Sequence, residues 1–391
     1  MDNFVFRNPT RILFGRDTED AVGEETAKYA RKVLIHYGGG SILKSGLFER
    51  VVESLRQAGV SYVELGGVQP NPRLSLVQEG IRLCREHGVE LILAVGGGSA
   101  IDSAKAIAMG VPYDGDVWDF YAGRKRPFDA LPVATVLTIP AAGSEASDSS
   151  VITNEDGWYK RGCTSELLYP VFSVLNPERM FTLPAFQVAC GAADIMAHMM
   201  ERYFTNTRNV ETVDRIIEGT LRTVIHNVPR FLANPSDYDA AAEIMWSGTL
   251  AHNNVMSTGR VGDWASHEIE HELSGIYDVA HGAGLATVFP AWMKYVFRHD
   301  INRFAQYAER VWGVEANHWN REETVTEGIR RQVAFYRSIG LPVTLAELGA
   351  GEDRIAEMAD KATAGDTRTL GQFVKLKKHD VVAILELARK A

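Results

Sequence analysis

Five residues with side chains that bind metals lie in three short segments of the second half of the chain. Asp194 and His198 are four positions apart, His267 and His271 repeat that spacing, and His281 follows in a third segment. Four residues make slightly more than one helical turn, so each pair lies on one helix face and can bind one ion. One carboxylate and several imidazoles, without cysteine, favour Fe²⁺ or Zn²⁺ over Ca²⁺ and exclude a structural thiolate zinc site.

Other residues near these histidines leave the ligand set open. A single histidine on an apolar helix is more often a hydrogen-bonded core residue than a ligand, but the repeated spacing favours the metal interpretation. Asp263 lies four residues before His267 and is a rival ligand. The adjacent acids Glu268, Glu270 and Glu272 are predicted to be solvated charges on a helix surface.

Two predicted strands end in the same sequence, Gly-Gly-Gly-Ser. Such a loop brings backbone N–H groups close to a phosphate, and the helix that follows points its positive end at it. One loop of this kind fits a tight turn equally well, whereas two in one sheet favour nucleotide or phosphate binding. Neither the Gly-x-Gly-x-x-Gly nor the P-loop pattern is present, so the pattern alone predicts a phosphate-bearing ligand. The candidate residues are Gly38, Gly39, Gly40, Ser41, Gly96, Gly97, Gly98 and Ser99.

Three further features belong to these loops. Asp102 lies one turn after the second glycine run and is either a helix first-turn acid or a ligand contact, two interpretations of equal weight. Lys44 or Lys105 could neutralise a phosphate, although an exposed surface lysine is the usual case. Small residues at 138–147 let the backbone approach a flat group, and Ser144 there is also a candidate helix cap.

The elements that must position these residues change character along the chain. Strands alternate with helices in the first half, which is typical of a mostly parallel sheet with right-handed crossovers. After Pro184 the β-branched runs disappear and helical spacing dominates. We therefore predict a Rossmann-like α/β domain at 1–180 and an all-helical domain at 181–391. Strands are predicted at 32–37, 60–65, 91–95 and 133–139, and helices at 47–58, 74–87 and 100–109.

The N-terminal residues form two short apolar runs. Phe4–Phe6 and Arg11–Gly15 are predicted to be antiparallel strands with a turn at Asn8-Pro9.

Composition limits the classes of partner. The 391 residues carry a net charge of −9, which argues against nucleic acid and anionic membranes as partners. No apolar stretch is long enough to span a membrane, and the first residues lack the basic and apolar regions of a signal peptide. Three cysteines are too few for a disulfide framework, so we expect a cytoplasmic protein.

With these motifs in view, the chain resembles the iron-containing (group III) alcohol dehydrogenases over nearly its whole length. Within that family it is similar to the butanol dehydrogenase and broad aldehyde reductase branch. The second glycine run matches the family's pyrophosphate loop, and 138–147 matches its motif beside the nicotinamide. The order and spacing of Asp194, His198, His267, His271 and His281 match its metal signature, which is the most specific of these similarities.

The resemblance implies a dinucleotide-binding α/β domain followed by a helical metal domain. It implies that Asp194, His198, His267 and His281 are the metal ligands, with Fe²⁺ favoured and Zn²⁺ the alternative. His271 then becomes the nearby histidine that is not a ligand, a candidate proton relay.

The resemblance also implies contacts with the cofactor and with a second subunit. Asn71 matches a loop near the adenosine, Lys160 aligns with a lysine near the cofactor, and Thr138 and Ser144 belong to the nicotinamide motif. Family members often form homodimers through their N-terminal strands, and residues 4–14 fit that role.

The first glycine run bears on the choice of cofactor. Members that prefer NAD commonly carry an aspartate at the position of Gly39, where it pairs with the adenosine ribose. Without that carboxylate a 2′-phosphate meets no repulsion, and Ser41 can donate a hydrogen bond to it. NADP(H) is therefore predicted, with NAD(H) as the alternative.

The predicted activity is reversible hydride transfer between a primary, butanol-like alcohol and NADP(H), with a metal as Lewis acid on the substrate oxygen. The substrate is expected to be a small uncharged alcohol or aldehyde. Alternatives are oxidation of a polyol such as glycerol or a diol with NAD(H), a dehydroquinate-synthase-like lyase reaction, and a non-catalytic nucleotide or metal sensor. The lyase needs a dense Lys/Arg site near 267–281, which the sequence lacks.

Overall fold

The computed structural model describes residues 1–390 as two compact units. The α/β unit comprises Arg7–Leu183. The helical unit comprises Met1–Phe6 together with the chain from Pro184 onward. The predicted fold class, a Rossmann-like α/β domain followed by a helical domain, is confirmed. The sequence-based division at residue 180 assigns Met1–Phe6 to the α/β domain, whereas in the structure these residues pack with the helical unit.

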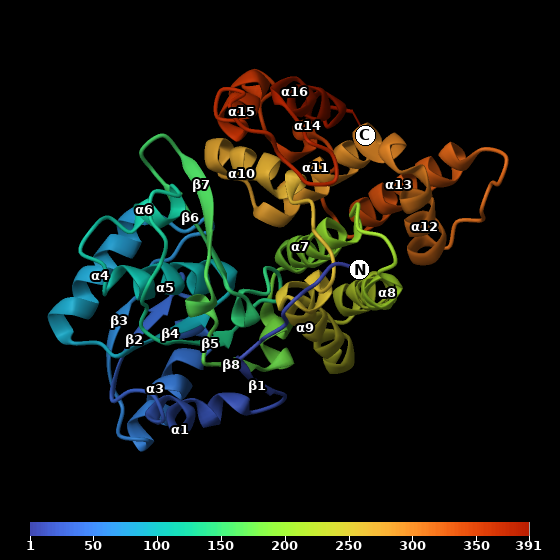
Figure 1. Cartoon of the computed structure of the whole chain (residues 1–391). Coiled ribbons are helices and arrows are strands. Elements are labelled where there is room, and N and C mark those ends of the chain that lie inside the picture. The colour runs from blue at the N-terminus through green and yellow to red at the C-terminus, as the bar shows by residue number, and fades with distance from the viewer. Residues whose placement is uncertain (391) are drawn as a thin grey trace. The chain divides into compact units, whose positions relative to one another are not determined.

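The α/β unit is built on a six-stranded sheet (Figure 1). Its strands are β1 (Arg11–Phe14), β2 (Lys32–Tyr37), β3 (Ser61–Leu65), β4 (Leu91–Gly96), β5 (Val133–Leu137) and β8 (Phe172–Leu175). All are parallel, in the order β1-β8-β5-β4-β2-β3. The central strands β4 and β5 are buried along their whole length, which explains their continuous apolar runs. The carboxyl ends of these strands lie at one edge, where ligands of open α/β sheets bind.

Helices cover both faces of this sheet (Figure 1). They are α1 (Val22–Ala27), α2 (Ser41–Lys44), α3 (Leu47–Gln57), α4 (Leu74–His87), α5 (Gly98–Gly110) and α6 (Trp118–Tyr121). Helix α3 places Leu47, Val51 and Leu55 on one stripe, and this stripe packs with Val33 and Ile35 of β2 in one apolar cluster. The opposite face of the sheet carries α4 and α5, and α5 holds the second glycine run at its first turn.

The N-terminal strand prediction is wrong in part. Arg11–Phe14 does form a strand, but it pairs in parallel with β8, and Phe4–Phe6 form no strand. The reason is that the four-residue strand Phe172–Leu175, which the sequence analysis overlooked, offers β1 a free sheet edge. The apolar residues of the N-terminal segment remain exposed, with Val5 95% accessible to solvent.

A separate antiparallel hairpin also escaped the sequence analysis. Strands β6 (Ser149–Asn154) and β7 (Tyr159–Thr164) pair from Ser149 opposite Thr164 to Asn154 opposite Tyr159. The hairpin follows the small-residue loop after β5 and carries Lys160. It therefore belongs to the same part of the unit as the predicted nicotinamide motif.

The helical unit contains ten α-helices within the described residues. They are α7 (Ala185–Tyr203), α8 (Glu211–Ala233), α9 (Tyr238–His252), α10 (Ala265–Tyr277), α11 (His281–Val296), α12 (Ile301–Trp312), α13 (Arg321–Ser338), α14 (Leu345–Leu348), α15 (Ile355–Ala362) and α16 (Lys378–Leu387). Helix α7 is buried from Ala192 to Tyr203 on all sides, so it forms the centre of the unit. Figure 1 shows α7 next to α11 and α9. In residues 1–390, no helix is long and apolar enough to cross a membrane.

Candidate active site

Three helices of the helical unit bring the predicted metal ligands together. Helix α7 presents Asp194 and His198 one turn apart, α10 presents His267 in its first turn, and His281 begins α11. Asp194, His198 and His267 are buried, and the side chain of His281 is 24% exposed. The i, i+4 spacing thus has the predicted result, because both α7 side chains leave one face of a buried helix.

Asp194 lies at the centre of this group. Its Oδ1 atom is 3.4 Å from His198 Nδ1, 3.9 Å from His267 Nε2 and 3.7 Å from His281 Nε2. One donor atom each from Asp194, His267 and His281 lies within 4.8 Å of the others. These separations are typical of donor atoms that surround an ion at about 2 Å each.

Several buried polar atoms at this place lack a hydrogen-bond partner in the described residues, which supports a bound cation. Asp194 Oδ1, His198 Nδ1 and His267 Nε2 are buried without a hydrogen-bond partner in the described residues. Buried polar atoms without partners are costly, and several of them around one point require an explanation. A divalent ion bound by a carboxylate and imidazoles satisfies all three, and this donor set suits Fe²⁺ or Zn²⁺. The residues therefore fit the metal that the sequence predicts.

Electrostatics at the site also favour a positive charge. Burial opposes charging of His267, but the carboxylates of Asp194 and Glu201 outweigh it and raise the pKa of His267 to about 9. Burial and the neighbouring His252 and His267 hold the pKa of His198 far below its usual value, so its ring stays neutral. His198 thus already has the neutral form that binds a metal, whereas His267 releases a proton when it binds one.

Glu201 is a site residue that the sequence analysis missed. It is fully buried on α7, and its Oε1 atom accepts a hydrogen bond from His267 Nδ1 at 2.8 Å. The same carboxylate accepts the backbone N–H groups of Trp264 and His267 at the start of α10. The spacing could have revealed it, because Asp194, His198 and Glu201 are at positions i, i+4 and i+7 of one helix.

The prediction that Glu268, Glu270 and Glu272 are solvated charges is wrong for two of them. Glu270 and Glu272 are fully buried. Glu270 Oε2 accepts a hydrogen bond from His281 Nδ1, whereas Glu272 lies 3.7 Å from the Lys361 ammonium. A sequence of acids on a helix does not reveal which face is inside. Here α10 is packed on several sides, so its acids are taken into the interior with partners.

Asp263, the rival ligand, has another role. Its Oδ1 atom accepts the backbone N–H groups of Gln372 and Phe373, both at 2.6 Å, and its Oδ2 atom accepts that of Ala265. Burial and the nearby Glu201 carboxylate raise the pKa of Asp263 to about 7. This side chain therefore joins the start of α10 to the 370s loop instead of pointing at Asp194.

His271 is half-buried one turn after His267. Its ring centroid is 5.8 Å from that of His281, and it forms a possible ligand group with Glu270 and His281. The structure thus brings all five predicted metal-site residues into one region of the helical unit.

Two glycines at the start of α11 allow this arrangement. A Cβ atom on Gly282 would lie 1.9 Å from the Cys190 carbonyl oxygen of α7, so the two helices touch backbone to backbone. A Cβ on Gly284 would lie 2.7 Å from Glu270 Oε1. Glycine at these positions therefore makes room for α7 on one side and for the Glu270 carboxylate on the other.

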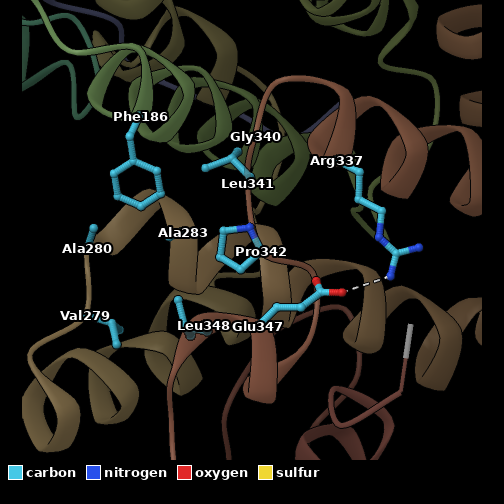
Figure 2. A pocket seen from close by; sticks show the side chains of 10 residues that line it. All are labelled: Phe186, Val279, Ala280, Ala283, Arg337, Gly340, Leu341, Pro342, Glu347 and Leu348. Carbon is cyan, nitrogen blue, oxygen red and sulfur yellow. Dashed lines mark hydrogen bonds and ion pairs between the residues drawn. The ribbon is translucent and has the colours of Figure 1, made fainter.

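A cavity of about 570 Å³ opens near the start of α11 (Figure 2). Its walls include Phe186, Ala283 and Leu341, and an Arg337–Glu347 ion pair lies at its edge. Ala283 is two residues after His281, which places it about 200° around the helix axis. Val279 and Ala280, which directly precede His281, also line the cavity, whereas His281 itself does not.

In the α/β unit, the second glycine run ends β4 and begins α5. Gly97 precedes the first residue of α5, and a Cβ on it would overlap Ile139 at 2.3 Å. A Cβ on Gly98 would lie 2.8 Å from the Ala142 side chain. The absence of side chains here lets the loops after β4 and β5 lie against each other, at the positive end of a thirteen-residue helix.

The first glycine run is different. A Cβ atom on Gly39 or Gly40 would meet nothing within 4 Å, and both residues are exposed at the end of β2. Ser41 and Lys44 begin and end the short α2 and are exposed. Residues with larger side chains would therefore fit at Gly39 and Gly40 without steric overlap.

Asp102 and Ser144 contact each other instead of standing free. The Ser144 hydroxyl donates to Asp102 Oδ1 at 2.6 Å, and the Val151 N–H donates to Oδ2 at 3.0 Å. Burial raises the pKa of Asp102, and the ammonium of Lys105 opposes this. The carboxylate thus ties α5 to the loop after β5 and to the hairpin. The prediction that Ser144 is a helix cap is wrong. The cap position of the short 3₁₀ turn Ser144–Ala146 is occupied by Gly143.

The sequence offers two interpretations of Lys105, an exposed surface lysine or a phosphate contact. The structure shows a different role. Lys105 is fully buried, and its ammonium donates to the backbone carbonyls of Ser144, Ser147 and Ser149 at 2.7, 2.8 and 2.9 Å. These three bonds use all three N–H groups of the ammonium. Lys105 therefore holds the loop beside Asp102 in one shape.

The remaining predicted cofactor residues are placed as follows. Asn71 is buried with a positive φ of 55° in the turn before α4, and Lys160 is buried on β7. Thr138 follows β5, and its N–H donates to the Gly96 carbonyl. Ser99 is half-buried in the first turn of α5. Except for Asn71, these residues lie around the carboxyl ends of β4 and β5 or on the adjacent hairpin.

Comparison with known proteins agrees with this arrangement. The family model for iron-containing alcohol dehydrogenases matches residues 9–177, and the model for the C-terminal part of the Fe-containing alcohol dehydrogenase family matches residues 188–389. The chain is 44% identical over 386 residues to the probable NADH-dependent butanol dehydrogenase 1 of Bacillus subtilis, with 99% of both chains covered.

Two further relatives extend the comparison. The NADPH-dependent aldehyde reductase YqhD of Escherichia coli is 35% identical over 396 residues, covering 100% of this chain and 98% of the relative. The crystal structure of NADH-dependent butanol dehydrogenase A from Thermotoga maritima superimposes with a TM-score of 0.96 at 44% identity, over 100% and 99% of the two chains. Fold, donor set and matches together define an oxidoreductase. The chain belongs to the iron-containing alcohol dehydrogenase family, in its butanol dehydrogenase and aldehyde reductase branch.

Proposed function

We propose that this alcohol dehydrogenase interconverts short, uncharged primary alcohols of the butanol type and their aldehydes, with NADP(H) as the preferred hydride carrier. The observation that carries the proposal is the convergence of three buried atoms that have no hydrogen-bond partner within the described residues: Asp194 Oδ1, His198 Nδ1 and His267 Nε2. The names of the relatives, butanol dehydrogenases and an aldehyde reductase, support the substrate class.

In this proposal Asp194, His198, His267 and His281 hold the divalent metal, with Fe²⁺ favoured and Zn²⁺ the alternative. When bound, the metal supplies a Lewis acid that polarises the oxygen of the alcohol or aldehyde. The four ligand side chains determine where that oxygen binds, and the buried residues of α7 and α10 around them exclude water.

His271 is proposed as the proton relay. Reduction of an aldehyde delivers a hydride to carbon and a proton to oxygen, so the site needs a donor that also reaches solvent. His271 is half-buried and adjacent to His281, which suits a group that exchanges protons with water. In the oxidation direction the same ring accepts the proton.

The cofactor is proposed to bind at the carboxyl ends of the strands of the α/β unit. The pyrophosphate lies at Gly96, Gly97, Gly98 and Ser99, where the N-terminus of α5 offers free N–H groups. Thr138, Ser144, Asp102 and Lys160 surround the nicotinamide side, Asn71 the adenosine side, and Gly38, Gly39, Gly40 and Ser41 the ribose. Catalysis then requires C4 of the nicotinamide to reach the substrate carbon.

The preference for NADP(H) rests on Gly39. This residue brings no carboxylate to the loop, and the open space around it leaves room for a 2′-phosphate that Ser41 can bind. We expect Gly39→Asp to reverse the ratio of kcat/KM values for NADPH and NADH in favour of NADH by at least tenfold. Equal kcat/KM values for the two cofactors in the wild-type enzyme would contradict this assignment.

The apolar N-terminus supports a homodimer through residues 4–14. Phe4, Val5 and Phe6 are exposed, and β1 is an edge strand with one unpaired side in the described chain. A reducing, cytoplasmic location is also proposed, because Cys84, Cys163 and Cys190 are all free thiols. Sedimentation of the purified protein as a monomer at micromolar concentration would contradict the dimer.

The function is tested by metal analysis together with an activity screen. The enzyme purified with metal should reduce butanal and related short aldehydes, followed as loss of NADPH absorbance. Removal of the metal with a chelator, verified by elemental analysis, should abolish turnover, and Fe²⁺ or Zn²⁺ should restore it. Full activity in protein that contains no metal would overturn the proposal, as would cofactor and metal binding without turnover on any of these substrates.

A further inference from the structure

Two buried glutamates outside the predicted ligand set each contact one predicted ligand histidine. We propose that Glu201 and Glu270 are positioning residues that hold the Nδ1 atoms of His267 and His281, aim both Nε2 atoms at Asp194, and thereby set the affinity of the helical unit for its divalent cation. The inference rests on the proposed function only in that Asp194, His267 and His281 bind this cation.

The first pair joins α7 to α10. Glu201 is fully buried, and the ring of His267 donates from Nδ1 to Glu201 Oε1 over 2.8 Å. With Nδ1 held in this way, the other ring nitrogen points to Asp194 Oδ1, 3.9 Å away. The backbone N–H groups of Trp264 and His267 also donate to Glu201, which fixes the carboxylate itself.

The second pair repeats this arrangement within α10 and α11. Glu270 is fully buried, and the His281 ring donates from Nδ1 to its Oε2 atom while His281 Nε2 lies 3.7 Å from Asp194 Oδ1. The other oxygen of Glu270 accepts the Ser274 hydroxyl. Gly284 leaves the space that this carboxylate occupies.

The chemistry of imidazole gives both pairs the same consequence. A neutral imidazole carries one N–H, and a carboxylate beside Nδ1 keeps the proton there, so the lone pair of Nε2 is available to a cation. Carboxylates that hold ligand histidines in this way typically change metal affinity 10- to 100-fold when they are mutated. Capping of a helix end alone would not require two such pairs that converge on Asp194 Oδ1.

A purely structural role makes a different prediction. The Glu201 carboxylate accepts backbone N–H groups of α10, so it also stabilises the start of that helix. The carboxylate uses Oε2 for the Trp264 N–H and Oε1 for the N–H and Nδ1–H of His267, whereas a glutamine offers one acceptor oxygen. Glu201→Gln therefore weakens both the cap and the hold on the ring, and the stability of the metal-free variant measures the first while its Zn²⁺ affinity measures the second. Glu270→Gln tests the hold on a ring without loss of a backbone cap, since Glu270 accepts from two side chains.

The experiment measures metal affinity rather than turnover. Metal-free wild-type enzyme, Glu201→Gln and Glu270→Gln are titrated with Zn²⁺ in competition with a chromophoric chelator, and folding is checked by circular dichroism and thermal unfolding without metal. We expect each variant to bind Zn²⁺ 10- to 100-fold more weakly. Glu272→Gln is the matched control, because Glu272 is equally buried on α10 but faces Lys361. Its affinity should stay within twofold of wild type.

A Zn²⁺ affinity of both variants within twofold of wild type would overturn the inference, even if the wild-type enzyme is an active metal-dependent dehydrogenase. Failure of the proposed function looks different, since it shows in the wild-type protein as activity without metal, as absence of stoichiometric metal, or as metal binding without turnover. A second measurement does not depend on the variants. In zinc-loaded wild-type enzyme labelled with ¹⁵N-histidine, His267 and His281 should coordinate through Nε2 and keep the proton on Nδ1; coordination through Nδ1 would contradict the inference.

Discussion

The two candidate sites use different chemical groups, backbone in the α/β unit and side chains in the helical unit. In the α/β unit the cofactor loops present mainly backbone, with Gly97 and Gly98 at the first turn of α5. In the helical unit the metal site consists of side chains on three helices around Asp194. Glycine allows close approach in the first case, and buried donors without partners mark the second.

The comparison also shows what the two sites share. In each candidate site, fully buried charged side chains form hydrogen bonds with the groups that are proposed to face a ligand. Lys105 donates to three carbonyls of the loop after β5, and Glu201 and Glu270 each accept from an imidazole. Burial of a charge is costly unless it is paired and hydrogen-bonded, so such residues are retained where position matters. The difference between the sites is therefore in the contact groups, and the similarity is in what orders them.

The sharpest contrast concerns glycines in the helical unit, and it gives the largest expected effect. Gly282→Ala places a Cβ atom 1.9 Å from a backbone oxygen of α7, which no side-chain rotation relieves. We expect a loss of more than about 3 kcal/mol in the free energy of unfolding, together with loss of bound metal, since His281 is the adjacent residue. Denaturant unfolding and elemental analysis measure the two effects.

Gly219→Ala provides the control for this prediction. Gly219 lies inside α8, and a Cβ there meets nothing within 4 Å. Alanine at a helix interior should stabilise the protein by about 0.5–1 kcal/mol. If Gly282→Ala behaved like Gly219→Ala, the close contact between α7 and α11 would play no part in forming the metal site.

The same comparison shows which features the sequence could predict. The strand at 32–37 and the helix at 74–87 were predicted residue for residue, because continuous burial and helical spacing leave a clear pattern. The candidate metal ligands Asp194 and His198 could be identified because their side-chain types are informative and their spacing is helical. The order β1-β8 was not predicted, since a four-residue strand of common apolar residues carries little information.

The buried charges could not be identified in the same way. A lysine or glutamate is usually exposed, and periodicity does not show whether a polar face is enclosed by another element. Lys105 is buried because the loop after β5 folds over it, and Glu270 because α11 begins beside it. Both contacts join residues that tertiary structure brings together, which is information that local sequence does not contain.

Removal of the Lys105 charge tests the comparison from the α/β side. Lys105→Met leaves the carbonyls of Ser144, Ser147 and Ser149 without their donor and Asp102 without its nearest positive charge. We expect a loss of about 3 kcal/mol of stability and at least tenfold weaker NADPH binding by fluorescence titration. Zn²⁺ affinity should not change.

An exposed lysine of the same unit gives the reference. Lys125→Met should change stability by less than about 0.5 kcal/mol and leave NADPH binding unchanged. If Lys105→Met matched this variant in cofactor affinity, the buried lysine would hold the loop without influence on the cofactor site.

The buried His36 in the sheet tests whether desolvation determines the protonation state of a titratable side chain in the α/β unit. His36 on β2 donates from Nδ1 to the Leu65 carbonyl and accepts the Ser103 hydroxyl at Nε2. Burial lowers the pKa of His36 to about 4, which the Leu65 carbonyl only partly opposes. The folded protein keeps the ring neutral, while the unfolded chain takes up a proton below pH 6.5, so this contribution is present above pH 6.5 and is lost as the pH falls.

We expect His36 to remove about 2 kcal/mol of stability between pH 7 and pH 5. Urea unfolding of wild type and His36→Asn at several pH values measures it, because the asparagine retains a donor near the Leu65 carbonyl and does not titrate. The stability difference between the two proteins should shrink by this amount on acidification. Parallel pH profiles would show that the neutral ring is not what the core requires.

The smallest expected effect concerns how the glutamates of the helical unit are themselves held. The Ser274 hydroxyl donates to Glu270 Oε1, so Ser274→Ala removes one of the bonds that fix this carboxylate but leaves its charge and its contact with His281. A single buried hydrogen bond to a charged group contributes about 1 kcal/mol, and part of this acts on folding rather than on the ion. We therefore expect Zn²⁺ binding to weaken two- to fivefold, clearly less than in Glu270→Gln. A loss as large as that of Glu270→Gln would mean that the orientation of the carboxylate, and not its charge, determines the metal affinity. The helical site would then depend on geometry to the same degree as the glycine loops of the α/β unit.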